Sequence, residues 1–186
     1  MRLKRLSFVL AVAASVFAAE GAPPLSVHLG EVDYLHRWSK AGQNEFTPKG
    51  QEDLDHWTDM VTIDVHEAVL NGDQLKTLAD QVLESYGASG KVLGADQKPA
   101  TKDAPAEYFA AAVLGPADAP EATFARFLLR EGRGVVVIYA HRVSGPKAET
   151  EMGTWLKNHG SEMDKTLRGW EAIPSLARLR GLPQSP

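Results

Sequence analysis

The sequence contains no cysteine in its 186 residues. Disulfides, thiolate metal sites, iron–sulfur clusters and cysteine nucleophiles are therefore excluded. Small secreted animal domains usually depend on disulfides, so an exported chain with this composition is more typical of a bacterial periplasm.

Recognisable catalytic and cofactor motifs are also missing. There is no dinucleotide-binding glycine pattern and no convincing Ser/His/Asp set. Residues 87–91, Gly-Ala-Ser-Gly-Lys, match neither a nucleophile elbow nor a phosphate loop. The sequence therefore predicts no cofactor and gives no direct evidence for an enzyme.

Only the N-terminus carries a long apolar run. Residues 6–17 are apolar or small, and three basic residues precede them: Arg2, Lys4 and Arg5. Val16 and Ala18 are small enough to position a cleavage before Ala19, and the run is too short to span a bilayer. We expect a cleaved signal peptide over residues 1–18, a flexible tether over 19–24, export to the periplasm and no stable membrane anchor.

Once that leader is removed, acidic residues clearly outnumber basic ones. The leader holds three of the 20 basic residues and none of the 24 acidic ones, which leaves a formal charge near −7. An acidic chain is a poor candidate for nucleic acid or for anionic membranes. Its length suits one α+β domain over residues 25–174 followed by a C-terminal tail over 175–186.

Hydrophobic periodicity predicts the main elements. Period-two alternation favours strands over residues 60–66, 107–114, 123–130 and 134–143, the last two as a hairpin. Apolar residues at helical spacing predict helices over 73–86 and 149–170, with a bend near Gly160. Short strands are indicated at 25–29 and 91–93, and residues 41–49 are interpreted as a polar loop.

This order of elements, with a long hairpin followed by a last long helix, resembles PsbP-like proteins, which include exported bacterial proteins of the DcrB type. The resemblance covers about residues 60–170. It implies an antiparallel sheet flanked by helices in an α/β/α-like sandwich, and a binding or accessory role rather than catalysis.

Aromatic residues near the N-terminus form one candidate binding region. They flank or lie within the polar segment 41–51: Tyr34, Trp38, Phe46 and Trp57. Such side chains line ligand clefts or anchor protein partners, although packing beneath a loop would serve equally well.

Arginines on the predicted hairpin form a second candidate region. Arg126 and Arg130 share one face of a strand, and Arg142 ends the next strand. Arginine is favoured at interfaces and at carboxylate or phosphate sites. An anionic ligand or an acidic partner is one interpretation, and a solvated basic face is the other.

Three residues offer an alternative site for a metal ion or for acid/base hydrolysis. Asp64 and His66 project from the same face of one strand, and His141 lies on another strand. If the two strands were neighbours, the three side chains could converge on a divalent metal. Ordinary surface histidines are the competing interpretation.

Residues 51–73 hold seven acidic residues and no lysine or arginine, which fits a solvated face or a patch for a basic partner. We therefore expect an exported, non-catalytic periplasmic protein that binds a protein partner or a small ligand, for example an immunity-type inhibitor. A small metal-dependent or acid/base hydrolase is the alternative.

Overall fold

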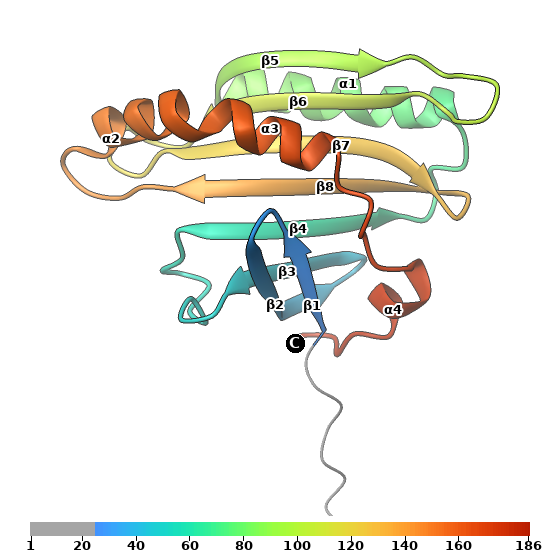
Figure 1. Ribbon diagram of the computed structural model, residues 1–186, viewed down its shortest axis with the longest axis horizontal. Helices are drawn as coiled ribbons and strands as arrows, with labels where there is room; N and C mark the ends of the chain where they lie inside the picture. The colour runs from blue at the N-terminus through green and yellow to red at the C-terminus, as the bar shows by residue number, and fades with distance from the viewer. Residues whose placement is uncertain (1–24) are drawn as a thin grey trace, which may run out of the picture.

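The computed structural model describes residues 25–186, so the expected signal peptide and tether lie outside the described residues. One antiparallel sheet forms the body of the protein (Figure 1). Its strands lie in the order β1-β2-β3-β4-β8-β7-β6-β5. Their bounds are β1 Ser26–Leu29, β2 Val32–Lys40, β3 Gln43–Pro48, β4 Asp59–His66, β5 Gly90–Lys98, β6 Glu107–Leu114, β7 Glu121–Arg130 and β8 Arg133–Arg142.

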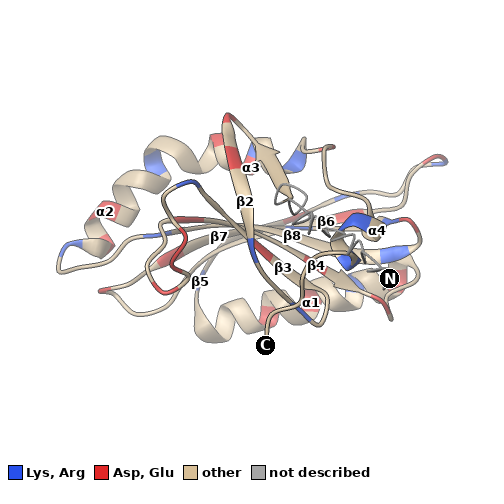
Figure 2. Cartoon of the chain, turned by 90° about the horizontal axis from the view of Figure 1, so that it is seen from below, with Lys and Arg blue, Asp and Glu red and all other residues tan. Residues whose placement is uncertain are grey.

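The helices are α1 (Gly72–Ser89), α2 (Ala148–Trp155), α3 (Ser161–Arg168) and α4 (Leu176–Arg180). A π-helical segment, η1 (Leu156–Gly160), joins α2 to α3 at the predicted bend. Figure 2 shows α1 on one side of the sheet and α2 and α3 on the other. Within the described part of the chain, no helix has the length and apolarity needed to cross a bilayer.

Strands β4 and β8 are neighbours along their whole length, from Asp59 opposite His141 to His66 opposite Gly134. The prediction that residues 60–66 and 134–143 share one sheet is therefore confirmed. Alternation then assigns every side chain to a face. We call the face that carries Val61 and Val137 the inner face, and the face that carries Thr62 and Ile138 the outer face.

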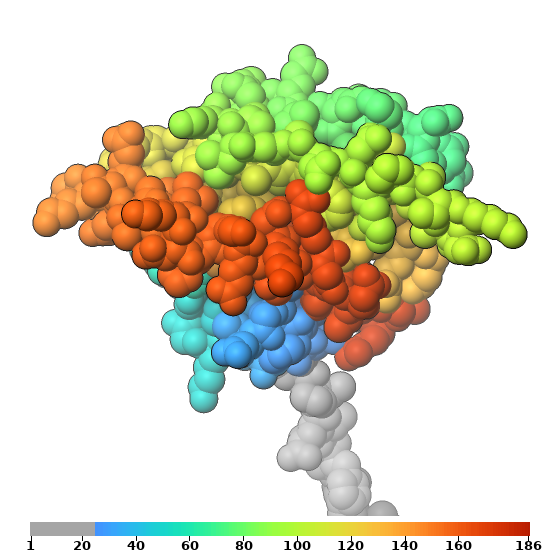
Figure 3. All heavy atoms as spheres, turned by 45° about the horizontal axis from the view of Figure 1, so that its top comes forward, coloured from blue at the N-terminus to red at the C-terminus, as the bar shows by residue number. Residues whose placement is uncertain are grey.

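The inner face encloses the main core. Valines of β4 and β8 pack there with Met152 and Leu167 from the helical segment and with Leu176 of α4. The sheet curls around this core: in the β1–β2 turn, a side chain at Gly30 would lie 3.8 Å from Thr166 of α3. Figure 3 shows the N-terminal strands beside the last helical segments. The outer face has a smaller core under α1, which includes Leu75 and Phe127.

These features correct the expected fold class. The fold is not a sheet sandwiched between helical layers: eight antiparallel strands curl into a half-barrel, and the helices are few and mostly short. On the outer face, α1 packs mainly over β5, β6 and β7, and it also contacts Val136 and Ile138 of β8. The candidate site lies beside α1, over the outer faces of β3, β4 and β8.

Candidate functional site

The outer face contains a groove of about 400 Å³ beside the C-terminal part of α1. Its floor is formed by strand residues, among them Thr62, Ile138 and Thr123. Glu45 and Asp64 line the groove from β3 and β4, and Glu121 lines it from β7. We refer to this feature as the outer-face groove.

One wall of the groove is a loop between β3 and β4 that holds Leu54 and Trp57. The loop is fixed by Gln51, whose Oε1 accepts hydrogen bonds from the backbone N–H groups of Thr58 (2.8 Å) and Asp59 (2.9 Å). Trp57 is 6% exposed and packs against Met60 and Ala140 on the outer face. The aromatic wall is therefore held in place by both packing and hydrogen bonds.

Arg142 links that wall to the opposite side of the groove. Its guanidinium lies over the Trp57 ring, 4.1 Å from the ring centroid, and pairs with the Glu121 carboxylate at 3.0 Å. A planar guanidinium suits both contacts, stacking on the ring and binding the carboxylate. The protein's own arginine therefore shows that this groove accommodates a cation.

The groove has a negative electrostatic character. Burial raises the pKa of the Glu45 carboxyl; the Gln43 amide opposes this, and the charge of Glu121 adds to it. Burial followed by the same Glu121 charge raises the pKa of Tyr86, at the α1 side of the groove, to about 12. Both shifts arise first from burial of the titrating group, and the poorly screened charge of Glu121 adds to each.

Three of the predicted site residues meet in this groove: Trp57, Asp64 and Arg142. Trp38 lies on the same face, opposite Glu45 in the β2–β3 register, but it does not line the groove. Tyr34 and Phe46 belong to the inner core, where they are 3% and 0% exposed. The structure therefore places these two aromatic residues in packing rather than in a cleft.

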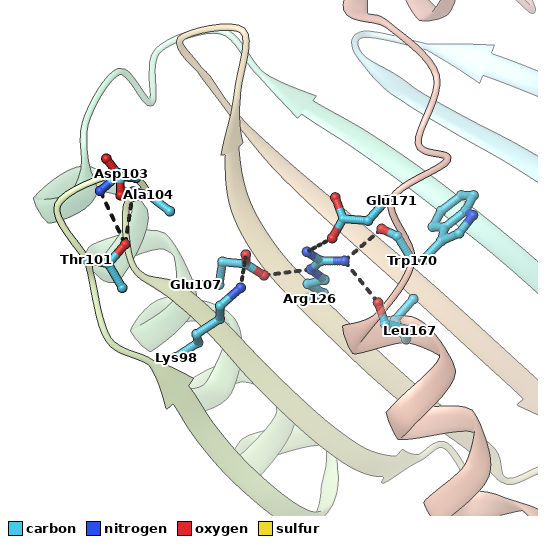
Figure 4. A network of polar contacts seen from close by, with 9 residues as sticks. All are labelled: Lys98, Thr101, Asp103, Ala104, Glu107, Arg126, Leu167, Trp170 and Glu171. Carbon is cyan, nitrogen blue, oxygen red and sulfur yellow. Dashed lines mark hydrogen bonds and ion pairs between the residues drawn. The ribbon is translucent and has the colours of Figure 1, made fainter.

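Arg126 and Arg130 lie on the inner face and hold the C-terminal segment against the sheet. Arg126 is 2% exposed; it pairs with Glu107 at 2.7 Å and donates to the backbone carbonyls of Leu167 and Trp170 (Figure 4). Arg130 donates to the Ile173 carbonyl at 2.7 Å. These contacts are structural, so the structure does not bring the two arginines to a ligand site with Arg142.

The alternative hydrolase set is divided between the two faces of the sheet. Asp64 and His66 pair with each other at 3.0 Å on the outer face. His141 is on the inner face, where its Nδ1 lies 3.0 Å from Asp59. The three residues therefore do not converge, and no cluster of metal-ligating side chains occurs among residues 25–186.

Sequence reasoning missed Glu45, Thr62, Glu121 and Thr123 as groove residues. The predicted strand began at residue 123, and extending its alternation back by two residues would have placed Glu121 on the same face as Thr123. Glu45 gave no such signal, because residues 41–49 were interpreted as a loop and not as the strand β3.

No family model and no curated protein matches this chain. Among solved structures, it is similar to the Ran-binding protein Mog1p of Saccharomyces cerevisiae, with 9% identity and a TM-score of 0.46 over 73% of this chain and 81% of that one. A mutant of protein Mog1 gives 8% identity and a TM-score of 0.44 over 85% of this chain and all of that one. These findings correct the expected PsbP-like and DcrB-like resemblance.

Proposed function

We propose that this chain is a non-catalytic binding protein that holds a segment of a protein partner in the outer-face groove. The observation that carries the proposal is the groove itself: a fixed aromatic wall, carboxylates on several strands and a floor of strand residues. A few convergent polar groups around a concave apolar surface are typical of binding sites. Ran, the partner named for yeast Mog1p, is not transferred to this chain, because the two structures share only 9% identity.

Site-specific photo-crosslinking tests this role in the cells that produce the protein. A benzophenone amino acid replaces Leu54 on the groove wall, and in a control chain it replaces Leu70, an exposed leucine outside the groove. Binding in the groove predicts a discrete protein adduct from position 54 that position 70 does not form. Equal adducts from both positions, or none from position 54, would contradict the proposal.

We also propose that the protein works after export, on the strength of the basic and apolar pattern in residues 2–19. Mass spectrometry of the mature N-terminus in a periplasmic fraction tests this, with Ala19 as the expected first residue. Full-length protein confined to the cytoplasm would contradict it. The narrower immunity-type role would make the crosslinked partner a toxin that acts on the cell envelope.

A further inference from the structure

One carboxylate of the outer-face groove, among the described residues, has only an amide as its side-chain partner. Asp64 pairs with His66 at 3.0 Å, and Glu121 pairs with Arg142 at 3.0 Å. Glu45 accepts a hydrogen bond from the Gln43 amide at 2.8 Å, but within residues 25–186 it forms no ion pair. A half-buried carboxylate whose only side-chain partner is an amide is stabilised when a cationic group of a ligand binds beside it.

The groove floor supplies a second, independent observation. Thr123 is 3% exposed, it lines the groove, and its Oγ1 has no hydrogen-bond partner among the described residues. Buried hydroxyl groups are nearly always paired, because an unpaired one loses its hydration without compensation. Because Oγ1 is enclosed, the side chain must rotate about its Cα–Cβ bond to turn the hydroxyl into the groove, where it can donate to, or accept from, the backbone of a bound chain.

The spacing of these two groups fits an extended segment. Glu45 is on β3 and Thr123 is on β7, with β4 and β8 between them. Ala125 is the β7 residue level with Glu45, and Thr123 is two residues further along that strand, so the separation is about 16 Å, the length of about five residues of extended chain. Between them lie the side chains of Thr62 and Ile138, which leave a half-polar, half-apolar floor.

We propose that the groove binds an extended partner segment through a lysine side chain, whose ammonium pairs with Glu45, while the backbone of another residue of the segment meets the Thr123 hydroxyl. Lysine is preferred over arginine because Arg142 already occupies the planar position between Trp57 and Glu121. An ammonium is compact and needs only separate oxygens, whereas a guanidinium needs a planar fork. This inference rests on the proposed function and names the chemistry of the segment.

The test uses capped five-residue peptides that differ only at the central position, which is lysine, norleucine or arginine in an otherwise Gly/Ala chain. Binding to the unlabelled peptides is followed by amide chemical shifts of the isotope-labelled protein. We expect shifts at Thr62 and Thr123, with the lysine peptide bound about tenfold more tightly than the norleucine peptide. Equal affinity for these two peptides, or tighter binding of the arginine peptide, would overturn the proposal.

Matched variants separate the two contacts. Glu45→Gln should remove the preference for lysine over norleucine, whereas Glu162→Gln, the same change at an exposed site on α3, should leave it intact. Thr123→Val should weaken both peptides by about threefold to tenfold, and Thr123→Ser, which keeps the hydroxyl, should not. A lysine preference that survives Glu45→Gln would refute the assigned contact.

The crosslinking experiment distinguishes failure of the proposed lysine contact from failure of the proposed function. An adduct from position 54 that persists in the Glu45→Gln chain would show that the groove binds a partner without the lysine contact. Loss of the adduct in Glu45→Gln, together with its retention in Glu162→Gln, is the outcome that supports both.

Discussion

The imidazole ring of His141 is stacked on the indole ring of Trp155, with centroids 4.0 Å apart and planes inclined by only 6°. This contact joins the end of β8 to the end of α2, and Asp59 of β4 holds the imidazole from its other side at 3.0 Å. Tyr139 donates to the same carboxylate at 2.6 Å. The cluster therefore connects the central strands to the helical cover of the inner face.

Asp59 is expected to make folding sensitive to acid. Burial opposes ionisation of Asp59, but hydrogen bonds from His141 and Tyr139 outweigh it and keep the pKa of the carboxyl below its ordinary value. A depressed folded-state pKa gives stability that is complete above the unfolded value and is lost as the pH falls through the folded value. We expect Asp59→Asn to lower the free energy of unfolding by about 2 kcal/mol at pH 7.

Urea unfolding at pH 7 and pH 3 measures this effect. The difference between Asp59→Asn and the unmodified protein should shrink at pH 3, where the unmodified carboxylate is becoming protonated. Asp55→Asn, at an exposed position in the neighbouring loop, is the control and should leave unfolding at both pH values unchanged. A pH-independent loss in Asp59→Asn would contradict the assigned role of the charge.

Arg126 should behave as a structural residue and not as a ligand-binding one. Arg126→Met would leave Glu107 without its buried partner and would free the carbonyls of Leu167 and Trp170. Breaking one side of a buried ion pair typically costs about 3–5 kcal/mol. Arg133→Met, which breaks an exposed pair with Glu67, is the control and should cost about 1 kcal/mol or less.

Thermal and urea unfolding of both variants give the comparison. Similar, small losses in Arg126→Met and Arg133→Met would show that the buried network does not stabilise the fold. Because Arg126 lies on the inner face and the groove is on the outer face, peptide binding by the folded fraction of Arg126→Met should be unchanged.

The sequence predicted best those elements whose apolar residues repeat with a clear period. Strand β8 and helix α1 were found in this way, and Gly160 marked the place where the predicted helix 149–170 becomes π-helical. Strand β3 was missed because Asn44, on its inner face, is polar although it is buried and hydrogen-bonded to the Ile63 carbonyl. With Gln43, Asn44 and Glu45 all polar, the start of the strand lacks the alternation by which a strand is recognised.

The candidate site was only partly predictable because it depends on strand order and register. Trp57 and Arg142 were identified by residue type, but their contact requires that the loop after β3 fold over the end of β8. Because the register between the two strands was unknown, the sequence analysis also grouped His141 with Asp64, which lies on the other face. One residue of register decides which face a side chain occupies, and sequence periodicity within a single strand does not contain that information.

In the turn between β2 and β3, substitutions at two adjacent residues are expected to change the free energy of unfolding in opposite directions. Ala41 and Gly42 both have positive φ angles, 52° and 97°, as a tight hairpin turn requires. Ala41→Gly should stabilise the protein by about 0.5 kcal/mol, because alanine is strained there. Gly42→Ala should destabilise it by about 2 kcal/mol or more, since a side chain at Gly42 would lie 2.7 Å from the Val65 carbonyl oxygen. Urea unfolding that shifted the same way in both variants would contradict this turn geometry.

Glu45 is expected to favour ligand binding in the outer-face groove while it lowers the stability of the fold at neutral pH. Its folded-state pKa is raised, first by burial and also by the charge of Glu121, so the ionised form is disfavoured in the folded state. The folded protein then holds the proton more tightly than the unfolded chain does, and this penalty disappears as the pH falls below the ordinary glutamate value. Glu45→Gln should therefore raise the free energy of unfolding at pH 7 and have little effect near pH 3, measured by urea unfolding. The same substitution is expected to abolish the preference for lysine peptides. A variant that gains stability while it loses binding would mark Glu45 as a residue kept for its ligand, whereas a loss of stability at pH 7 would show that Glu45 supports the fold.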